Sequence, residues 1–375
     1  MIQRLTFRIS GFFWLVLMLS VPAFGQKTGK QAPPAGSYQQ AVVKAQKAQV
    51  LMDAGKTDEA IPLLESCTRL DPQNVDYGYE LAYAWSLKKQ DSIALSILYP
   101  LLDKPKTTDL IYELAGNCQE KLLQNAGAFE TYKAGLLKFP ASGRLSMECG
   151  QKEMEQKQYN RALVYFEKGI EAEPAFSSNY YWAAKLFAHS SEPVWAMIYG
   201  ELYVLLDRGS PRSDEISKLL YETYKNQIRF RADTTFTINF SKQASSIGDT
   251  TKGKKAKLPF GVGVYEPAMG IAVLTEHSID LNSLDRIRKR FVENYFSSGI
   301  NKQYPNLLLD YQDEVLKAGQ MEAYNHWLLM EGDMAAFKAW HKTNSVKWIS
   351  FGYWFKQHPL KVDKLHRFYR GQYEL

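Results

Sequence analysis

Small residues recur along this chain at a fixed step of 34 positions. One series consists of alanines only: Ala60, Ala94, Ala128, Ala162 and Ala196. A second series runs beside it at the same step: Ala48, Ala82, Gly116, Gly150 and Ala184. Because two helices cross closely only where the facing side chains are small, the paired series predict one close crossing in each unit. A step of this length is typical of a helix-turn-helix hairpin, so five units predict a mostly α-helical stack.

A third, partial series consists of Pro72, Pro140 and Pro174. Proline lacks an N–H group and clashes with the preceding turn, so it is expected to end the second helix of a hairpin. The three series divide the chain into the units 41–74, 75–108, 109–142, 143–176 and 177–210. The stretch Ser213–Ile228, with apolar residues at helical spacing, is expected to cap the open end of the stack.

The residues that accompany these series resemble the tetratricopeptide repeat family. In the fourth unit, Gly150 lies in the first helix, Ala162 and Phe166 follow four apart in the second, and Pro174 closes the unit. The resemblance covers about 170 residues. It departs from the family pattern in each first helix, where the consensus Trp is missing. It departs again at Pro105, one position early, and in the fifth unit, where Gly200 and Arg208 replace the aromatic residue and the proline.

The resemblance implies a curved superhelix whose first helices line the concave face. In the family's geometry, the second, fifth and ninth positions of each unit point there. In this chain these positions include Tyr79, Tyr83, Glu113, Asn117, Arg144, Gln151, Tyr181 and Lys185. Tyr, Asn and Arg side chains suit contact with an extended peptide or a protein surface, and the alternative is an ordinary solvated helix face. Glu113 lies where a clamp for an acidic peptide would need a cation, so no such clamp is expected.

The N-terminus has the pattern of a secretory signal peptide. Arg4 and Arg8 precede the apolar run Ile9–Val21, and small residues follow at Ala23 and Gly25. A basic start, a short apolar core and a small-residue exit predict cleavage after residue 25. The alternative is an uncleaved anchor, although a spanning helix needs about 20 apolar residues.

Residues 26–40 are expected to form a flexible leader. The mature protein is then expected outside the cytoplasm, in a bacterial periplasm, either free or in an outer-membrane-associated complex. The formal charge of +6 becomes +4 without the two N-terminal arginines, which is too mild to indicate nucleic-acid binding. The three cysteines, Cys67, Cys118 and Cys149, have no CxxC spacing. Neither a disulfide framework nor a metal site is expected, and Cys67 and Cys149 are interpreted as small core residues.

The pattern changes after residue 228, and residues 229–375 are predicted to form a smaller α+β domain. Apolar residues occupy the even positions from Ile228 to Phe240, except at Thr234, and again from Leu258 to Val264, which predicts two antiparallel strands. A third strand is proposed at Met269–Leu274. The polar segment 241–257 carries five lysines. It is interpreted as a soluble loop, the alternative being contact with anionic lipid or polysaccharide.

Five helices are predicted after the strands: Leu281–Phe296, Leu307–Ala318, Met321–Met330, Asp333–Lys342 and Val346–Lys356. Ser283 is a candidate cap for the first. The last helices are dense in Trp, Phe and Tyr, and such a cluster at helical spacing is interpreted as core rather than as a binding patch.

No catalytic, cofactor or metal site is predicted from the motifs. His326, His341, His358 and His366 lack the i, i+4 spacing of a helical zinc site. Gly261-Val262-Gly263 lacks the third glycine and the lysine of a phosphate loop, and it is interpreted as strand with a close backbone approach. No Gly-x-Ser-x-Gly elbow occurs.

The sequence therefore favours an exported, non-catalytic scaffold that holds a protein or peptide, with no small-molecule substrate evident. The alternative is an envelope enzyme or carbohydrate-handling protein, which uses the repeats as a docking arm. A deep pocket lined by His326, Glu331 and His341 would support that alternative. A third hypothesis is a structural member of an outer-membrane secretion or assembly complex.

Overall fold

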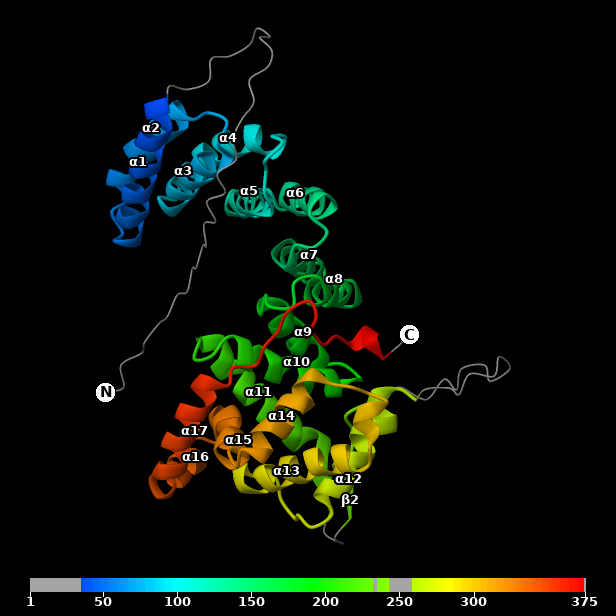
Figure 1. The fold of residues 1–375 in the computed structure, drawn as a ribbon. Helices are drawn as coiled ribbons and strands as arrows, with labels where there is room; N and C mark the ends of the chain where they lie inside the picture. Colours follow the sequence, from blue (N-terminus) through cyan, green and yellow to red (C-terminus); the bar gives the residue numbers. More distant parts are fainter. Residues whose placement is uncertain (1–34, 232–234, 243–257, 374–375) are drawn as a thin grey trace, which may run out of the picture.

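The computed structural model describes residues 35–231, 235–242 and 258–373. The predicted signal peptide, residues 26–34 of the leader and most of the lysine-rich segment lie outside these ranges. Within them, helices alternate regularly from residue 35 to residue 206 and form five antiparallel hairpins that follow an arc (Figure 1). The ten helices are α1 (Ala35–Asp53), α2 (Thr57–Leu70), α3 (Val75–Leu87), α4 (Asp91–Leu102), α5 (Asp109–Lys121), α6 (Asn125–Lys138), α7 (Gly143–Glu155), α8 (Tyr159–Ala172), α9 (Ser178–Ala188) and α10 (Pro193–Leu206). Helix α1 begins before residue 41, where the first unit was predicted to start.

The small residues of both series lie at the helix crossings, as predicted. All alanines of the two series are fully buried. A Cβ atom added to Gly116 would lie 2.1 Å from the ring of Tyr132, and one added to Gly150 would lie 2.3 Å from the ring of Phe166. Glycine is therefore needed where the second helix presents an aromatic ring, whereas alanine suffices elsewhere.

The turn inside the first four hairpins also repeats at the 34-residue step. Gly55, Lys89, Leu123 and Lys157 each adopt a positive φ, between 60° and 74°. Only the first is glycine, so three of the four turns hold a side chain in a conformation that L-residues disfavour. Helices α2, α6 and α8 each end two residues before the predicted proline.

Helix α11 (Pro211–Gln227) packs against α9 and α10 at the end of the array, and Ser210 caps it by accepting a hydrogen bond from the Ser213 amide. Gly200 allows its close approach, because a Cβ atom there would lie 3.0 Å from Leu220 Cδ2. Its other side is covered in turn by the short helix η4 (Met330–Gly332), where a Cβ atom on Gly332 would lie 2.1 Å from the Tyr221 ring.

The predicted strand at 228–240 is itself a hairpin. Strand β1 (Ile228–Phe230) pairs antiparallel with β2 (Phe236–Ile238), with Ile228 opposite Ile238 and Phe230 opposite Phe236. Because each of these pairs joins two even positions, the alternation continues through the turn and conceals it.

The predicted strands at 258–264 and 269–274 are wrong. Residues Gly261–Tyr265 form the π-helix η2, and Glu266–Val273 form α12. The buried residues of this stretch fall in adjacent pairs four apart: Phe260, Gly261, Val264, Tyr265, Ala268, Met269, Ala272 and Val273. This helical period outweighs the short alternation. The predicted close approach at Gly261 is present, since a Cβ atom would lie 2.4 Å from Ser241 Cβ.

The five predicted C-terminal helices are confirmed within one residue at each end, apart from Met330, which belongs to η4. They are α13 (Leu281–Ser297), α14 (Leu307–Lys317), α15 (Met321–Leu329), α16 (Met334–Thr343) and α17 (Ser345–Gln357), with the short helices η3 (Ile300–Lys302) and η5 (Arg370–Gln372). The predicted cap is wrong by three positions. Asp280 is the N-cap of α13, and Ser283 completes a capping box with it.

One hydrophobic core runs from Ala162 in α8 to Tyr373 near the C-terminus. Trp340, Phe351 and Phe355 are buried in it, which agrees with their interpretation as core, whereas Tyr353 is 71% exposed. After α17 the chain runs back toward α9 and α10 (Figure 1). There Phe368 and Tyr373 pack against the ring of Trp195. The fifth hairpin and the C-terminal helices therefore share a core.

Candidate functional site

The first helices lie on the inner side of the arc and the second helices on the outer side (Figure 1). The predicted contact residues belong to four successive first helices, α3, α5, α7 and α9, and are called here the concave face: Tyr79, Tyr83, Glu113, Asn117, Arg144, Gln151, Tyr181 and Lys185. Their surroundings differ strongly along the array.

Helix α3 presents two tyrosines. The rings of Tyr79 and Tyr83 stack with their centroids 6.4 Å apart and their planes 3° apart. Tyr83 is 39% exposed, whereas Tyr79 is largely covered. Burial and the nearby carboxylate of Glu113 raise the pKa of Tyr79, so its hydroxyl stays neutral. The pair offers a flat aromatic surface at this end of the concave face.

Between α5 and α7, Arg144 is already engaged by carboxylates. Its Nη1 lies 2.9 Å from Glu113 Oε2, and its Nε lies 3.5 Å from Asp109 Oδ2. The guanidinium also lies over the ring of Phe176, 5.6 Å from the centroid. Burial raises the pKa of Glu113, and Arg144 opposes that shift. Arg144 thus joins two hairpins.

The two amides of the concave face are bound to neighbours within the array. Asn117 Oδ1 accepts a hydrogen bond of 2.6 Å from the hydroxyl of Tyr132, whose ring lies against Gly116. Gln151 Nε2 donates to Glu148 Oε2 over 3.2 Å. Asn117 therefore helps to hold the helix crossing in place.

An ionic cluster on α5 and α7 lies outside the second, fifth and ninth positions from which the concave face was predicted. Lys152, nearly buried, lies 2.5 Å from Glu120 Oε1 and 2.7 Å from Glu155 Oε1. Glu148, also nearly buried, has its pKa raised to about 8 by burial and then by the carboxylates of Glu113 and Glu120. These residues lie one to four positions away from the predicted ones, and the acidic excess of α5 and α7 was the available sequence signal.

At the far end, α11 covers part of the concave face. Glu215 of α11 accepts a hydrogen bond of 2.6 Å from the Tyr181 hydroxyl and lies 2.7 Å from Lys185 Nζ. The guanidinium of Arg212 lies over the Tyr181 ring, 4.9 Å from the centroid. Tyr181 is only 5% exposed. The capping helix therefore takes up both predicted residues of α9.

A pocket of about 300 Å³ opens between α7 and α9, lined by Gln151, Met154, Glu155 and Trp182. The indole Nε1 of Trp182 is buried and has no hydrogen-bond partner in the described part of the chain. Of these residues, sequence reasoning named only Gln151.

The C-terminal segment lies on the outer side of the array. The guanidinium of Arg370 binds Glu167 of α8, and its amide donates to the Tyr199 hydroxyl of α10 over 2.8 Å. Residues 362–364 line a cleft of about 670 Å³ together with the loops that precede α7 and α9. Most of these contacts are to second helices or to loops between hairpins, but the cleft also includes Asp109 at the start of α5, and the Arg370 guanidinium lies 5.5 Å from the centroid of the Phe187 ring of α9.

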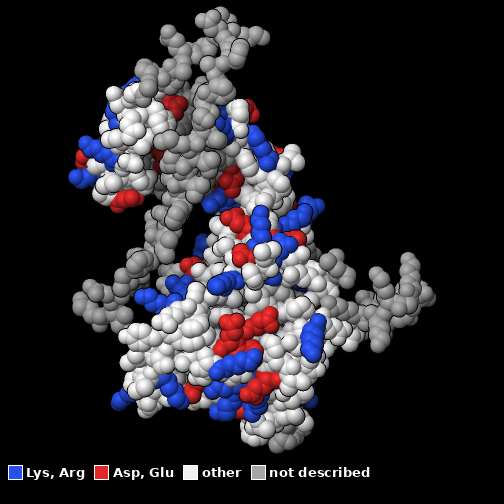
Figure 2. Space-filling view, in the orientation of Figure 1, with Lys and Arg blue, Asp and Glu red and all other residues white. Residues whose placement is uncertain are grey.

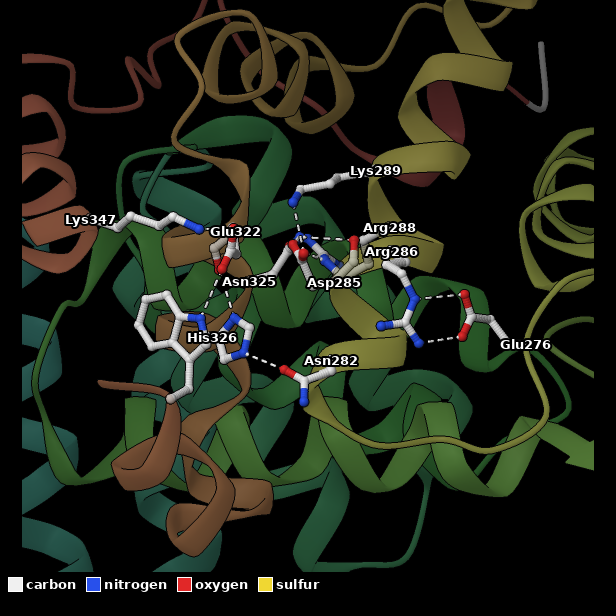
Figure 3. A network of polar contacts seen from close by, with 11 residues as sticks. Glu276, Asn282, Asp285, Arg286, Arg288, Lys289, Glu322, Asn325, His326 and Lys347 are labelled. Carbon is white, nitrogen blue, oxygen red and sulfur yellow. Dashed lines mark hydrogen bonds and ion pairs between the residues drawn. The ribbon is translucent and has the colours of Figure 1, made fainter. Parts of the chain in front are cut away.

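The histidines named for the enzyme alternative are part of the packing, and Figure 3 shows His326 beside Glu322 and Asn282. His326 is 1% exposed and stacks on Trp340 with the centroids 4.2 Å apart. Its Nδ1 lies 2.8 Å from the Glu322 carbonyl oxygen, and burial lowers its pKa. His341 lies against the rings of Phe337 and Trp348. Among the described residues, no group of three or more His, Cys, Asp or Glu side chains is placed to hold a metal ion.

A pocket among the C-terminal helices is lined by residues other than His326, Glu331 and His341. A cavity of about 340 Å³ is lined by residues of α14 and of the segment after α17, including Asp310, Glu314, His358 and His366. Acidic side chains gather over α14 in Figure 2. Burial, together with Asp313 and Glu314, raises the pKa of Asp310.

A buried polar network joins the array to the C-terminal helices. Arg288 of α13 lies 2.7 Å from Glu201 Oε1 of α10 and donates to the hydroxyl of Tyr224 over 2.8 Å. Gln312 and Tyr324 also donate to Glu201 Oε1. Both charges are more than nine-tenths buried, so this network fixes how α10 sits against α13, α14 and α15.

A family model described as tetratricopeptide repeat matches residues 41–74, which are the first unit. Four more hairpins follow at the same 34-residue step. Residues 41–74 are a tetratricopeptide repeat, and the array has repeated hairpins like those of tetratricopeptide-repeat proteins.

Several solved structures are similar to this chain. MamA from Desulfovibrio magneticus RS-1 is 15% identical, with 46% of this chain and 97% of that chain covered and a TM-score of 0.36. Pseudomonas aeruginosa PilF is 18% identical, with 51% and 86% covered and a TM-score of 0.45. A tetratricopeptide repeat protein from Parabacteroides merdae ATCC 43184 is 13% identical, with 84% and 98% covered and a TM-score of 0.39. No curated protein matches the sequence. Among the described residues, no helix combines the length and the apolar character that crossing a bilayer requires.

Proposed function

We propose that this protein is a non-catalytic scaffold that binds a protein or peptide on its concave face. The observation that carries the proposal is the position of the C-terminal segment. Its described contacts are with the second helices, the outer loops, Asp109 at the start of α5 and Phe187 of α9, and none of them is with Tyr79, Tyr83 or Gln151. A surface that offers rings, amides and charges on successive helices suits an extended partner.

We also propose that the protein works after export, in the periplasm of a bacterium, either free or in an outer-membrane-associated complex. The support is the basic start, apolar run and small-residue exit of residues 1–25. Sequencing the N-terminus of the protein recovered from the envelope tests this, and Gln26 is the expected first residue. An N-terminus that still carries the apolar run would favour the uncleaved anchor.

An enzyme with its site in the C-terminal helices has weaker support. His326 is enclosed by Trp340 and by backbone contacts of α15, where a substrate has no access. The cavity beside α14 brings carboxyl and imidazole groups together, and it is the place where an activity would be sought.

The test is affinity capture from the envelope with the mature chain, cross-linked and analysed by mass spectrometry. We expect a stoichiometric protein that is lost on Tyr83→Ala and retained on Tyr159→Ala, because Tyr83 lies on α3 and the 51% exposed Tyr159 begins the outer helix α8. A partner retained by the Tyr83→Ala, Gln151→Ala double variant would contradict the concave face as the binding surface. A partner set made up of outer-membrane assembly proteins would favour the structural-complex hypothesis over a free adaptor.

A further inference from the structure

The concave face between α5 and α9 carries more carboxylates than cations. On α5 and α7 the acidic side chains are Asp109, Glu113, Glu120, Glu148 and Glu155, and the basic ones are Arg144 and Lys152. Each basic group is already paired with two of the acids, Arg144 with Asp109 and Glu113, and Lys152 with Glu120 and Glu155. On α9, Lys185 is paired with Glu215 of α11, and its Nζ lies 5.3 Å from the centroid of the Trp182 ring. Glu148 forms no ion pair within the described residues, and its carboxylate accepts from the Gln151 amide. This part of the concave face therefore has an excess of negatively charged groups.

The pocket beside this cluster has the shape and chemistry for a long basic side chain. Gln151 both lines the pocket and binds Glu148, so the two are adjacent. Met154 and the indole of Trp182 provide apolar walls, and Glu155 provides a carboxylate at the rim. An arginine or lysine places its methylene stem against apolar walls while its charged end reaches a carboxylate or lies over an aromatic ring.

The indole of Trp182 provides an independent indication of a ligand. Its Nε1–H is buried and lacks an acceptor in the described part of the chain. A buried donor without an acceptor costs free energy. The backbone carbonyl of an extended segment laid across α7 and α9 would supply that acceptor.

We propose that the partner's bound segment is basic, and that one of its lysine or arginine side chains enters the pocket formed by Gln151, Met154, Glu155 and Trp182. This proposal rests on the proposed function and specifies the chemistry of the partner at the same face. An acidic segment is disfavoured, because the carboxylates around the pocket repel it. The Tyr79–Tyr83 stack lies on α3, two hairpins away from α7, and provides a second, aromatic contact for the same extended segment.

Binding of a cation here is coupled to a proton. Glu148 faces Glu113 and Glu120 from α5, Tyr132 from α6, and Arg144 and Lys152 on its own helix. In the protein without a bound segment, the Glu148 carboxyl has its pKa raised to about 8 and is mostly protonated at pH 7. A bound cation favours the ionised form, so binding at pH 7 releases about one proton and tightens as the pH rises from 6 to 8.

The experiment uses the full mature chain and two labelled synthetic peptides in fluorescence anisotropy. One peptide carries three arginines in a Gly-Ser background, and the other carries three glutamates at the same positions. We expect the basic peptide to bind at least about tenfold more tightly at low salt. Calorimetry in two buffers of different ionisation enthalpy measures the released proton.

Variants assign the effect to the pocket. Glu155→Gln and Trp182→Phe should each weaken the basic peptide about fivefold or more, and Glu148→Gln should abolish the pH dependence. The matched control is Glu130→Gln on the outer helix α6, whose carboxylate is exposed and pairs with Lys133, and it should leave the affinity unchanged. Thermal unfolding checks that each variant is folded.

Two results would overturn the inference: equal affinity for the basic and acidic peptides, or an equal loss with Glu130→Gln. If neither peptide binds while a captured partner is still lost on Tyr83→Ala, the scaffold proposal stands and the basic-segment proposal fails. If every concave-face variant captures the partner as well as the parent protein does, the scaffold proposal itself fails.

Discussion

The first four hairpins and the C-terminal body are held together in different ways. From Ala41 to Cys149, the described buried apolar side chains form four separate clusters, each shared by helices that are near neighbours in the chain. From Ala162 onward they form one continuous cluster that extends to Tyr373. Contacts in the body also join distant segments, as in the pair of Glu201 and Arg288. The array should therefore lose structure hairpin by hairpin, whereas the body should unfold as one unit.

The largest expected effect comes from breaking the buried network of the body. Glu201→Ala leaves the guanidinium of Arg288 buried without a counter-charge, so the free energy of unfolding should fall by about 3–5 kcal/mol. The matched variant in the array is Glu113→Ala. Because Arg144 is partly exposed, Glu113→Ala should lower the free energy of unfolding by less than about 1 kcal/mol.

Urea unfolding followed by tryptophan fluorescence measures the difference, since six of the eight tryptophans lie at or beyond residue 182. The double variant Glu201→Leu, Arg288→Met should regain most of the lost stability, because it removes both charges together. Equal effects of Glu201→Ala and Glu113→Ala would mean that the body does not depend on this network.

The second prediction is that the array and the body respond to pH in opposite directions. The pKa of Glu148 is raised to about 8, so the folded array keeps a proton that the unfolded chain releases above pH 4.5. The contribution of Glu148 to stability therefore falls as the pH rises from 4.5 to about 8, by about 2–4 kcal/mol. The pKa of His326 is lowered from 6.5, so the unfolded body takes up a proton first and the body loses stability as the pH falls below 6.5.

Circular dichroism, which reports on all helices, and tryptophan fluorescence, which reports mainly on the body, separate the two effects between pH 5 and 8. Glu148→Gln should flatten the pH dependence of the array only. His326→Phe, which keeps the stacking on Trp340, should flatten that of the body only. A Glu148→Gln chain that follows the parent at every pH would show that this carboxyl is ionised in the folded state.

Sequence alone predicts the array well because its determinants are local and repeated. The small residues fix the crossings, and each hairpin packs mainly on the next, so the positions of Tyr79, Tyr83 and Gln151 follow from the period. Their partners do not follow, because the pKa of Glu148 and the pocket at Trp182 depend on how successive hairpins approach each other. The 34-residue period therefore predicts which residues lie on the concave face, but it does not predict their partners, the pKa of Glu148 or the pocket at Trp182.

In the body the same reasoning finds the helices and misses the strands. The alternation from Phe260 to Val264 fits a strand as well as it fits one side of a helix, and only the pairs of buried residues that continue to Val273 decide between them. A usable signal was present at the junction. Gly200 and Arg208 break the repeat pattern, and they are the points where α11 and α17 dock: the Arg208 guanidinium lies 3.6 Å from the centroid of the Phe355 ring.

The third prediction tests whether the array depends on its small residues as strictly as the packing suggests. Gly116→Ala forces a Cβ atom to within 2.1 Å of the Tyr132 ring. We expect a loss of about 1–3 kcal/mol, because the hairpin must open or the ring must leave its rotamer. The matched control in the body is Gly352→Ala in α17, where nothing lies within 4 Å.

Gly352→Ala should stabilise the protein by about 1 kcal/mol through helix propensity. Thermal unfolding monitored by circular dichroism gives both values, and the Gly116→Ala loss should appear in the part of the transition that tryptophan fluorescence does not follow. A Gly116→Ala chain as stable as the parent would mean that α5 and α6 separate without cost.

The smallest predicted effect is a gain of stability at a turn of the array. Leu123 has a φ of 60° and is 85% exposed, so its side chain contributes little packing while its backbone is strained. Leu123→Gly should relieve that strain and stabilise the array by up to about 1 kcal/mol.

The equivalent residue of the first hairpin, Gly55, also has a positive φ, and Gly55→Ala should destabilise the array by a similar amount. Because each substitution acts on a single hairpin of the array, each should shift the circular dichroism transition and leave the tryptophan fluorescence transition unchanged. A shift of both transitions together would mean that the array and the body unfold as one cooperative unit, against the clustering of their buried side chains.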